Sequence, residues 1–373
     1  MTAGAAAGQE RAFAEVRRIS SAGLDGPELL RRAARALRRA VPHDAYCAST
    51  VDPASNLITH GIAEGMGGGS GDEGETFLDH VYFEEDLHQT RAMVREGRPV
   101  QLLSRTTGGR LDRSLRYREI LKPLGFAHEL GSVFADGSAW GGMDLIRGAD
   151  LPDFTTREVA LVRRLAPHVG AGLKAAALRS RAVARRDDPG VPGVLNLDQE
   201  GSIVSLTPAA ERWLGDLEDL HPAWRGGHTP IPVRMVAGAL RRSLDPASQE
   251  DHDLVPRVRV RGRSGRWISL YASRAESSDG RPGETVVVIE PARPEDVAWL
   301  NVASYGLTAR EEEVVRLVAR GRTTREISAE IFVSEHTVQR HIQNAFEKVG
   351  VRNRGELVKR LYFENLLPGM LGG

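Results

Sequence analysis

Four polar residues in the segment 334–349 have the spacing of one helix face. They are His336, Gln339, Arg340 and Gln343, and neighbours in this set are one, three or four positions apart. An arginine donates two parallel hydrogen bonds to the edge of a guanine, and a glutamine pairs in the same way with an adenine. The face therefore has the chemistry for reading base edges in the major groove of duplex DNA.

A second set of polar residues lies beside this face and suits phosphate oxygens. Contacts to phosphates fix the position of a protein on DNA without reading its sequence. The set comprises Thr323, Arg325, Thr337, Asn344 and Lys348. His341 lies nearby, and because no second ligand stands at a suitable spacing, we interpret it as a packing or phosphate-contacting residue and not as a metal ligand.

The positive charge of this region is modest. Residues 321–360 contain eight Lys or Arg and five Glu, an excess of three positive charges. Over the whole chain of 373 residues, 50 basic side chains balance 50 acidic ones, so nucleic-acid contact must be local. We therefore expect the affinity for DNA to depend on a dimer that binds two half-sites.

The helices that would carry these residues have start and stop signals. Thr or Asn followed three residues later by Glu has the spacing of a capping box, and a glycine accepts the left-handed conformation at a helix end. The pairs are Thr308 with Glu311, Thr323 with Glu326 and Asn353 with Glu356, and the stop is Gly321.

Apolar residues on the second and third of these helices predict how they pack. The third helix is expected to begin at the cap Ser334. The residues expected to be buried are Ile327 and Ile331 on the second helix, and Val338, Ile342, Ala345 and Val349 on the third. Packing of these side chains would hold the two helices at a fixed angle and leave the polar face outward.

The segment "YGLTAREEEVVRLVARGRTTREISAEIFVSEHTVQRHIQNAFEKVGVRNRGELV" resembles the LuxR/FixJ-type helix-turn-helix family, with many spaced positions in agreement and no gaps. The resemblance implies an all-α, four-helix DNA-binding domain over residues 300–368 and a transcription regulator that is not an enzyme. It maps the family's base-reading positions onto Gln339, Arg340 and Gln343. Many members carry lysine at the first of these, so the DNA sequence preference stays open.

The same resemblance implies partners. Double-stranded DNA is the first, and RNA polymerase is a further partner that a regulator of transcription allows. Family members commonly form homodimers through the last helix, where this chain has an apolar stripe formed by Leu357, Leu361 and Leu366.

The first 187 residues have the pattern of an α+β domain. Apolar residues recur at helical spacing over residues 13–41, and Leu30, Ala33, Leu37 and Val41 share one face. Runs rich in β-forming residues predict a hairpin over 44–63 and two antiparallel strands over 125–147. The glycine cluster between them lacks the full spacing of a nucleotide-binding loop, so we interpret it as a flexible surface loop.

A long helix is expected over residues 155–186, with a kink at Pro167. Its apolar stripe allows two interpretations, the pairing of two copies of the chain or packing on its own domain. The stripe comprises Val162, Leu165, Val169, Leu173 and Ala176. The Pro- and Gly-containing stretch 185–193 then predicts a domain boundary.

Residues 188–294 predict a second α+β domain. Their order is strand, glycine turn, strand and a helix that starts at Thr207, followed by three more strands within 257–291. Prolines at 291–294 mark the next boundary.

The two N-terminal regions carry further resemblances. The segments "VPHDAYCAS", "PLGFAHEL", "SAWGGMDLIRG" and "PDFTTREVALVRRLAPHVGAGL" resemble GAF-like domains of actinobacterial regulators, and "VLNLDQEGSIVSLTPAAERWL" resembles a PAS-like fold. Together they imply a multidomain sensor with GAF-like (1–187) and PAS-like (188–294) domains. No cofactor is expected, although the resemblance allows an unidentified small-molecule ligand.

Two other classes of function stay open. An enzyme would use the first domain, with Cys47 and His43 or the histidines His60, His80 and His88 as candidates. A protein-interaction scaffold would use the sensory folds for docking. The lone cysteine, the lack of a long apolar run and the absence of a leader pattern predict a cytoplasmic protein with no membrane partner.

Overall fold

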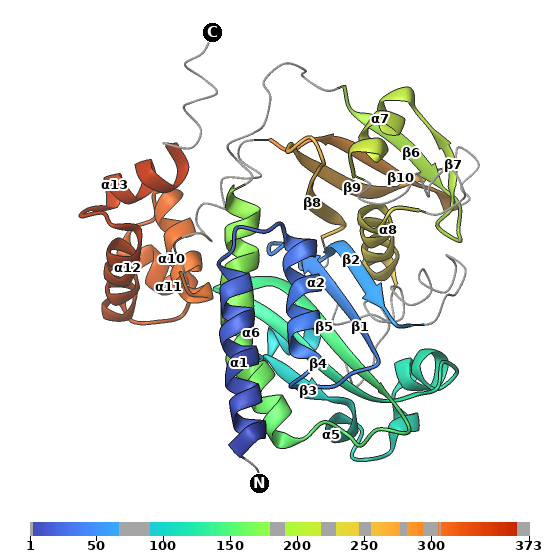
Figure 1. Cartoon of the computed structure of the whole chain (residues 1–373). Coiled ribbons are helices and arrows are strands. Elements are labelled where there is room, and N and C mark those ends of the chain that lie inside the picture. Colours follow the sequence, from blue (N-terminus) through green and yellow to red (C-terminus); the bar gives the residue numbers. More distant parts are fainter. Residues whose placement is uncertain are drawn as a thin grey trace. The chain divides into compact units, whose positions relative to one another are not determined.

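The computed structural model describes residues 3–66, 90–179, 191–217, 229–245, 255–276, 282–293, 305 and 307–363. The chain forms two compact units. The first contains two antiparallel sheets, and the second, from Ala292 onward, contains the C-terminal helices (Figure 1). The chain is therefore multidomain, with one helical and one mixed α and β part.

The first sheet has the strand order β2-β1-β5-β4-β3. Its strands are β1 (Ala45–Val51), β2 (Ile58–Glu64), β3 (Val100–Leu102), β4 (Phe126–Asp136) and β5 (Ser138–Gly148). Both hairpins expected from the sequence are present: β1 pairs antiparallel with β2, and β4 lies beside β5 with Gly137 at φ 77° in the turn. The glycine cluster lies outside the described residues from position 67 onward.

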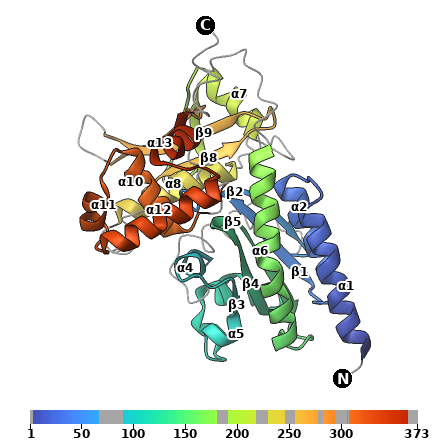
Figure 2. The same ribbon diagram turned by 90° about the vertical axis from the view of Figure 1, so that its left-hand side faces the viewer.

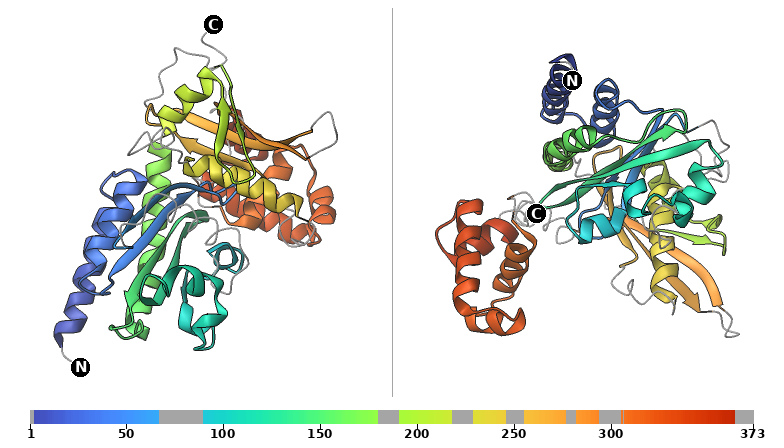
Figure 3. Two further views of the ribbon diagram at one scale, coloured as in Figure 1. Left: turned by 90° about the vertical axis from the view of Figure 1, so that its right-hand side faces the viewer. Right: turned by 90° about the horizontal axis from the view of Figure 1, so that it is seen from below.

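Three helices cover one face of this sheet, as Figures 1 and 3 show: α1 (Ala3–Ser20), α2 (Gly26–Leu37) and α6 (Thr156–Arg179). The helical spacing expected over residues 13–41 is therefore realised by two helices and not by one. Asp25 starts the second of them, because its carboxylate accepts a hydrogen bond from the Glu28 amide at 2.8 Å.

The stripe on α6 packs within the domain. Val162, Leu165, Val169 and Leu173 are buried, and α6 packs against α1 and α2. Gly172 permits the close approach, because a Cβ there would lie 2.6 Å from the carbonyl oxygen of Ser20. Of the two interpretations of this stripe, packing on its own domain is the one that the fold uses.

Shorter helices connect the strands of the first sheet. They are α4 (Thr90–Arg95), α5 (Leu103–Thr106), a 3₁₀ turn (Leu111–Arg113) and a π-helical turn (Tyr117–Leu121). The segment Leu103–Thr106 follows β3 directly, and it places Arg105 beside the edge of the sheet.

The second sheet repeats the topology of the first, with the order β7-β6-β10-β9-β8. In each sheet the second strand along the chain is at one edge and the third is at the other. The strands are β6 (Gly193–Leu197), β7 (Ile203–Leu206), β8 (Arg257–Arg261), β9 (Trp267–Glu276) and β10 (Pro282–Pro291). The strand–turn–strand–helix order and the three later strands match the sequence-based expectation.

Two helices complete this part. Helix α7 (Pro208–Leu217) begins with proline, as expected, and α8 (Ile231–Leu244) is a helix that the sequence reading missed. Eight residues of α8 are buried, and Val233, Val236, Ala237 and Leu240 among them have the spacing of one helix face. It joins the two sheets, because Leu57 and Ile58 share its hydrophobic core.

A buried ion pair also links the two sheets. The Asp52 carboxylate accepts hydrogen bonds from the Arg259 backbone amide at 3.0 Å and from its Nε at 3.1 Å. The Asp52 side chain is 1% exposed, so its charge depends on these partners and on the hydroxyl of Ser55. The two sheets are thereby held as one unit.

Replacing Asp52 with alanine is expected to destabilise the first unit by about 3–5 kcal/mol, because the Arg259 guanidinium loses its buried partner. Urea unfolding followed by circular dichroism measures the change. Ser55→Ala is the matched control: it removes the hydrogen bonds of the Ser55 hydroxyl within the turn, to Asp52 and from the Leu57 amide, and should cost about 1 kcal/mol. Equal losses from the two variants would contradict a link between the sheets.

Candidate nucleic-acid interface

Four helices pack around one core in the described residues of the C-terminal unit. They are α10 (Ala309–Ala319), α11 (Thr324–Glu330), α12 (Glu335–Val349) and α13 (Arg354–Val358), the last continuing as a π-helical turn (Lys359–Phe363). Figure 2 shows α10, α11 and α12 grouped together. Ser334 caps α12, since its Oγ accepts from the Thr337 amide at 3.2 Å, and Gly350 ends it in the left-handed conformation.

Helix α12 is divided into a buried and an exposed face. All six side chains expected to be buried on α11 and α12 are at most 6% exposed. His336, Gln339, Arg340 and Gln343 are exposed on the other side of α12. Within the described part of the chain, none of these four side chains makes a hydrogen bond or an ion pair. Their donors and acceptors are free for a ligand.

The caps expected from the sequence are confirmed for the first two helices of this unit. Thr308 with Glu311 and Thr323 with Glu326 form complete capping boxes. Gly321 has φ 80° just after α10, as expected for a helix stop. At α13, the Asn353 side chain accepts a hydrogen bond from the Glu356 amide. The Glu356 carboxylate accepts one from the amide of Arg352 and not from that of Asn353, so the capping box is incomplete.

Two contacts that the sequence reading missed fix the turn between α11 and α12. The Ser328 hydroxyl donates to the Val333 carbonyl at 2.6 Å, and Arg310 of α10 donates to the Ile331 carbonyl at 2.6 Å. The arginine satisfies a carbonyl at the end of α11 that has no intrahelical partner. No local sequence signal announces this contact, because it joins residues 21 positions apart.

Lys348, expected at a DNA phosphate, pairs with an acidic residue of its own unit. Its Nζ forms an ion pair with the carboxylate of Glu311 at 2.6 Å, and the Glu311 side chain is only 4% exposed. The lysine therefore ties the end of α12 to the capping box of α10 and compensates a buried charge. The buried carboxylate needs a cation, and Lys348 supplies it, while the expected contact of Lys348 with a DNA phosphate stays a prediction.

The other residues expected at phosphates differ in how free they are. Arg325 is exposed on α11 and makes no hydrogen bond or ion pair within the described residues. Asn344 is half-buried and likewise has no such partner there. Thr323 and Thr337 are engaged at helix starts: Thr323 in its capping box, and Thr337 with the Ser334 hydroxyl at 2.9 Å.

The leucines expected at a dimer contact serve the domain's own core. Leu357 and Leu361 have no exposed surface, so they cannot also offer side chains to a second copy. Leu366 lies outside the described residues. His341 is half-buried, and its Nδ1 is buried without a hydrogen-bond partner among the residues described.

Comparison with known proteins agrees with this geometry. Residues 305–361 match the model of the GerE family, "Bacterial regulatory proteins, luxR family". Spore germination protein GerE of Bacillus subtilis is 49% identical over 55 residues, which cover 15% of this chain and 74% of GerE. This chain belongs to the LuxR family of bacterial regulatory proteins.

Further similarities to known proteins cover larger shares of this LuxR-family protein. The transcriptional regulatory protein DesR of Bacillus subtilis is 44% identical over 67 residues, or 18% of this chain and 34% of DesR. The chain thus spans only about a third of that relative. Among solved structures, a Vibrio cholera VqmA–ligand–DNA complex aligns with 50% of this chain and 87% of its own at 18% identity, with a TM-score of 0.23.

The residues that an enzyme would use do not form a reactive set among those described. Cys47 is buried, and burial raises the pKa of its thiol. His43 is buried with its Nδ1 at 2.8 Å from the Val41 carbonyl, and burial lowers the pKa of its imidazole. His60 lies 3.2 Å from the Thr50 hydroxyl, while His80 and His88 lie outside the described residues. Over the described ranges, no group of three His, Cys, Asp or Glu could hold a metal ion.

A cluster of charges inside the first sheet belongs to its core. The Arg116 side chain is 2% exposed and pairs with Glu129 and, at 3.3 Å, with Asp144. Asp144 lies opposite Cys47 in the register of β1 and β5. The positive charge of Arg116 offsets part of the negative charge of the two carboxylates, and these charged groups lie close to the buried Cys47.

In the described part of this LuxR-family protein, no helix is long and apolar enough to span a bilayer.

Replacing Lys348 with methionine is expected to lower the stability of the C-terminal unit by about 1–3 kcal/mol at neutral pH. Burial by itself raises the pKa of Glu311, but hydrogen bonds from Lys348 and Thr308 outweigh it and hold the pKa below its ordinary value of 4.5. The stabilisation from ionised Glu311 is therefore present above the unfolded-state pKa and is lost as the pH falls through the folded-state pKa. The deficit of the variant should shrink over the same range.

Hydrogen exchange of the α12 amides, followed by mass spectrometry from neutral to acid pH, measures this difference. Lys359→Met is the matched control, because Lys359 is exposed and has no partner among the described residues. A deficit that is the same size for both variants, or that does not depend on pH, would show that Lys348 is not compensating Glu311.

Phe332 is expected to destabilise the turn that it occupies. It has φ 55° and is 94% exposed, so it combines a left-handed backbone with no packing. Phe332→Asn should raise the stability of the C-terminal unit by up to about 1 kcal/mol, because asparagine adopts this conformation more readily. The same exchange measurement detects the gain. A loss of stability would mean that the ring packs on the protein after all.

Proposed function

We propose that this LuxR-family protein regulates transcription by binding specific DNA sequences, with α12 as the recognition helix. The observation that carries the proposal is the free polar face of α12. Four side chains suited to base edges lie on one side of a helix whose other side is buried, and none is engaged within the described residues. A helix of this kind fits the major groove of B-form DNA.

The roles of the residues follow from their chemistry. Arg340 is proposed to donate to a guanine, and Gln339 and Gln343 to pair with adenines, with His336 near the start of the helix as a further base contact. Arg325 is the strongest proposed phosphate contact, because it is exposed and without an acidic partner in the described residues. Thr323, Thr337 and Asn344 are proposed to add weaker phosphate contacts from the same side.

Lys348 needs a separate role in this proposal. Its ammonium group lies 2.6 Å from the Glu311 carboxylate, with which it forms an ion pair. We propose that Lys348 holds α12 against α10 and that the same ammonium group contacts a phosphate when DNA is bound.

The two sheets are proposed to be the sensory part, with a GAF-like domain over residues 1–187 and a PAS-like domain over 188–294. In support, both sheets have the same strand order, and helices cover the first of them. A small molecule is the proposed signal, and RNA polymerase is a proposed partner at the promoter. A homodimer is proposed to bind two half-sites, and the buried Leu357 and Leu361 mean that its contacts come from other side chains.

Base reading by Arg340 has a direct test. A duplex selected from a random library with the full-length protein is compared with a random duplex by fluorescence anisotropy. Arg340→Ala should weaken binding to the selected duplex by about 1–3 kcal/mol and leave binding to random DNA nearly unchanged. Arg325→Ala should weaken both equally and reduce the salt dependence by about one phosphate contact.

Arg316→Ala is the control for the loss of a positive charge, because Arg316 is exposed on α10 and has no acidic partner in the described residues. It should leave both affinities close to those of the unaltered protein. If Arg340→Ala weakens the two duplexes equally, Arg340 contacts phosphates. If selection from the library enriches no sequence, the proposal fails and a protein-interaction scaffold becomes the better account.

A further inference from the structure

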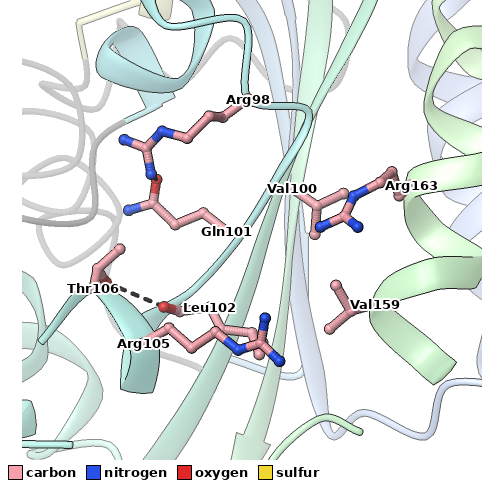
Figure 4. A pocket seen from close by; sticks show the side chains of 8 residues that line it. All are labelled: Arg98, Val100, Gln101, Leu102, Arg105, Thr106, Val159 and Arg163. Atoms are coloured by element: carbon pink, nitrogen blue, oxygen red, sulfur yellow. Dashed lines mark hydrogen bonds between the residues drawn. The ribbon is translucent and has the colours of Figure 1, made fainter. Parts of the chain in front are cut away.

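A cavity of about 360 Å³ opens at the edge of the first sheet, between β3, α5 and the first turns of α6. This volume is within the range of sites for small organic molecules. Figure 4 shows its lining. The cavity lies at the free edge of the sheet, because β3 is the last strand in the order, and it is separate from the ion cluster of Arg116.

Two guanidinium groups face this cavity without an acidic partner. Arg105 of α5 and Arg163 of α6 are exposed, and neither side chain makes an ion pair or hydrogen bond within the described residues. Arg163 has no acid three or four positions away on its helix, where Val159, Ala160, Ala166 and Pro167 stand. No carboxylate lines the cavity among the residues described.

The nearest acids in sequence are engaged elsewhere. Glu158 binds Arg147 at 2.5 Å and accepts from the Thr155 amide at 2.7 Å, and Asp153 accepts from the Ser104 hydroxyl at 2.5 Å. Arg164, the neighbour of Arg163, pairs with Glu10 at 2.9 Å. The fold thus satisfies the surrounding charges and leaves two cations at the cavity.

The third arginine of the lining is neutralised and positions a polar wall. Arg98 pairs with Glu96 at 2.6 Å and donates to the Gln101 side-chain oxygen at 2.9 Å. Figure 4 shows Arg98 and Gln101 on one side of the strand, while Val100, Val159, Arg105 and Arg163 lie on the other. Val100 and Val159 line the cavity together with the two free arginines and are at most 8% exposed, so the apolar bed that they form is small.

We propose that this cavity binds a small organic anion, a carboxylate or phosphate monoester with a compact apolar body. The planar guanidinium fork matches both kinds of anion with two parallel hydrogen bonds. Two such forks offset one or two negative charges, and the valines accept the apolar body. This proposal concerns only the first sheet and does not depend on DNA binding, so the two can be tested independently.

The test measures binding to the full-length protein by isothermal titration calorimetry. The probes are benzoate, phenyl phosphate, inorganic phosphate and benzamide, the last being neutral and close in shape to benzoate. Benzoate or phenyl phosphate is expected to bind with a Kd below about 1 mM, and benzamide at least about tenfold more weakly. Binding of benzoate alone identifies a carboxylate site, and binding of phenyl phosphate alone identifies a phosphate site.

Variants separate the site from general attraction to a basic surface. Arg105→Gln and Arg163→Gln should each weaken binding at least about tenfold, and the double variant should abolish it. The melting temperature should not fall, because neither side chain has a partner to lose. Arg39→Gln is the matched control: Arg39 is exposed, lies outside the lining and has no partner in the described residues, so binding should be unchanged.

Three results would overturn the proposal. The first is that neither organic anion binds, and the second is that the double variant binds as tightly as the unaltered protein. The third is that inorganic phosphate binds as tightly as phenyl phosphate and benzoate does not bind, since the apolar bed would then play no part.

Discussion

Burial of one side of α12 is the constraint on which the proposed interface depends. Val338, Ile342, Ala345 and Val349 fill the core between α10 and α11, and a helix cannot rotate away from such packing without exposing all of them to water. The polar side chains on the other face are therefore held outward whether or not a ligand is present. Their free donors and acceptors are a consequence of the core, and the DNA-binding proposal rests on them.

Polar contacts adjust the angle that this packing sets. Arg310 binds the carbonyl at the end of α11, Ser328 closes the turn, and Lys348 joins the end of α12 to the buried Glu311. Each contact satisfies a group that would otherwise be buried without a partner. These backbone carbonyls and the Glu311 carboxylate thus fix the angle between α11 and α12 through the hydrogen bonds that they accept. A fixed angle suits a surface that must match the groove of a duplex.

In the N-terminal unit, buried charged groups likewise have partners. Its buried ions, such as Asp52 with Arg259 and Arg116 with Glu129, are paired, and the first of these pairs joins the two sheets. At the cavity beside β3 the two arginines are exposed, and no carboxylate of the described part of the chain lines the cavity with Arg105 and Arg163. Water solvates the two exposed guanidinium groups, and an anion bound in the cavity would form ion pairs with them.

The amino-acid sequence determined the local elements, because their signals are local. Capping residues, glycine turns and alternating apolar residues specified the two hairpins of the first domain, the strands of the second and the helices of the last. The outward face of α12 followed as well, since its spacing needs only a helix and a buried side. Helix α8 was missed, although Val233, Val236, Ala237 and Leu240 recur at the spacing of a helix face.

Tertiary structure alone decided which side chains meet. The pairing of Lys348 with Glu311, of Arg310 with Ile331 and of Asp52 with Arg259 joins residues 21 to 207 positions apart, and no spacing rule reaches so far. It also decided that Leu357 and Leu361 are core residues and that the α6 stripe packs on α1 and α2. An apolar stripe states only that a face must be covered, and the surface that covers it is fixed by the packing of the whole unit.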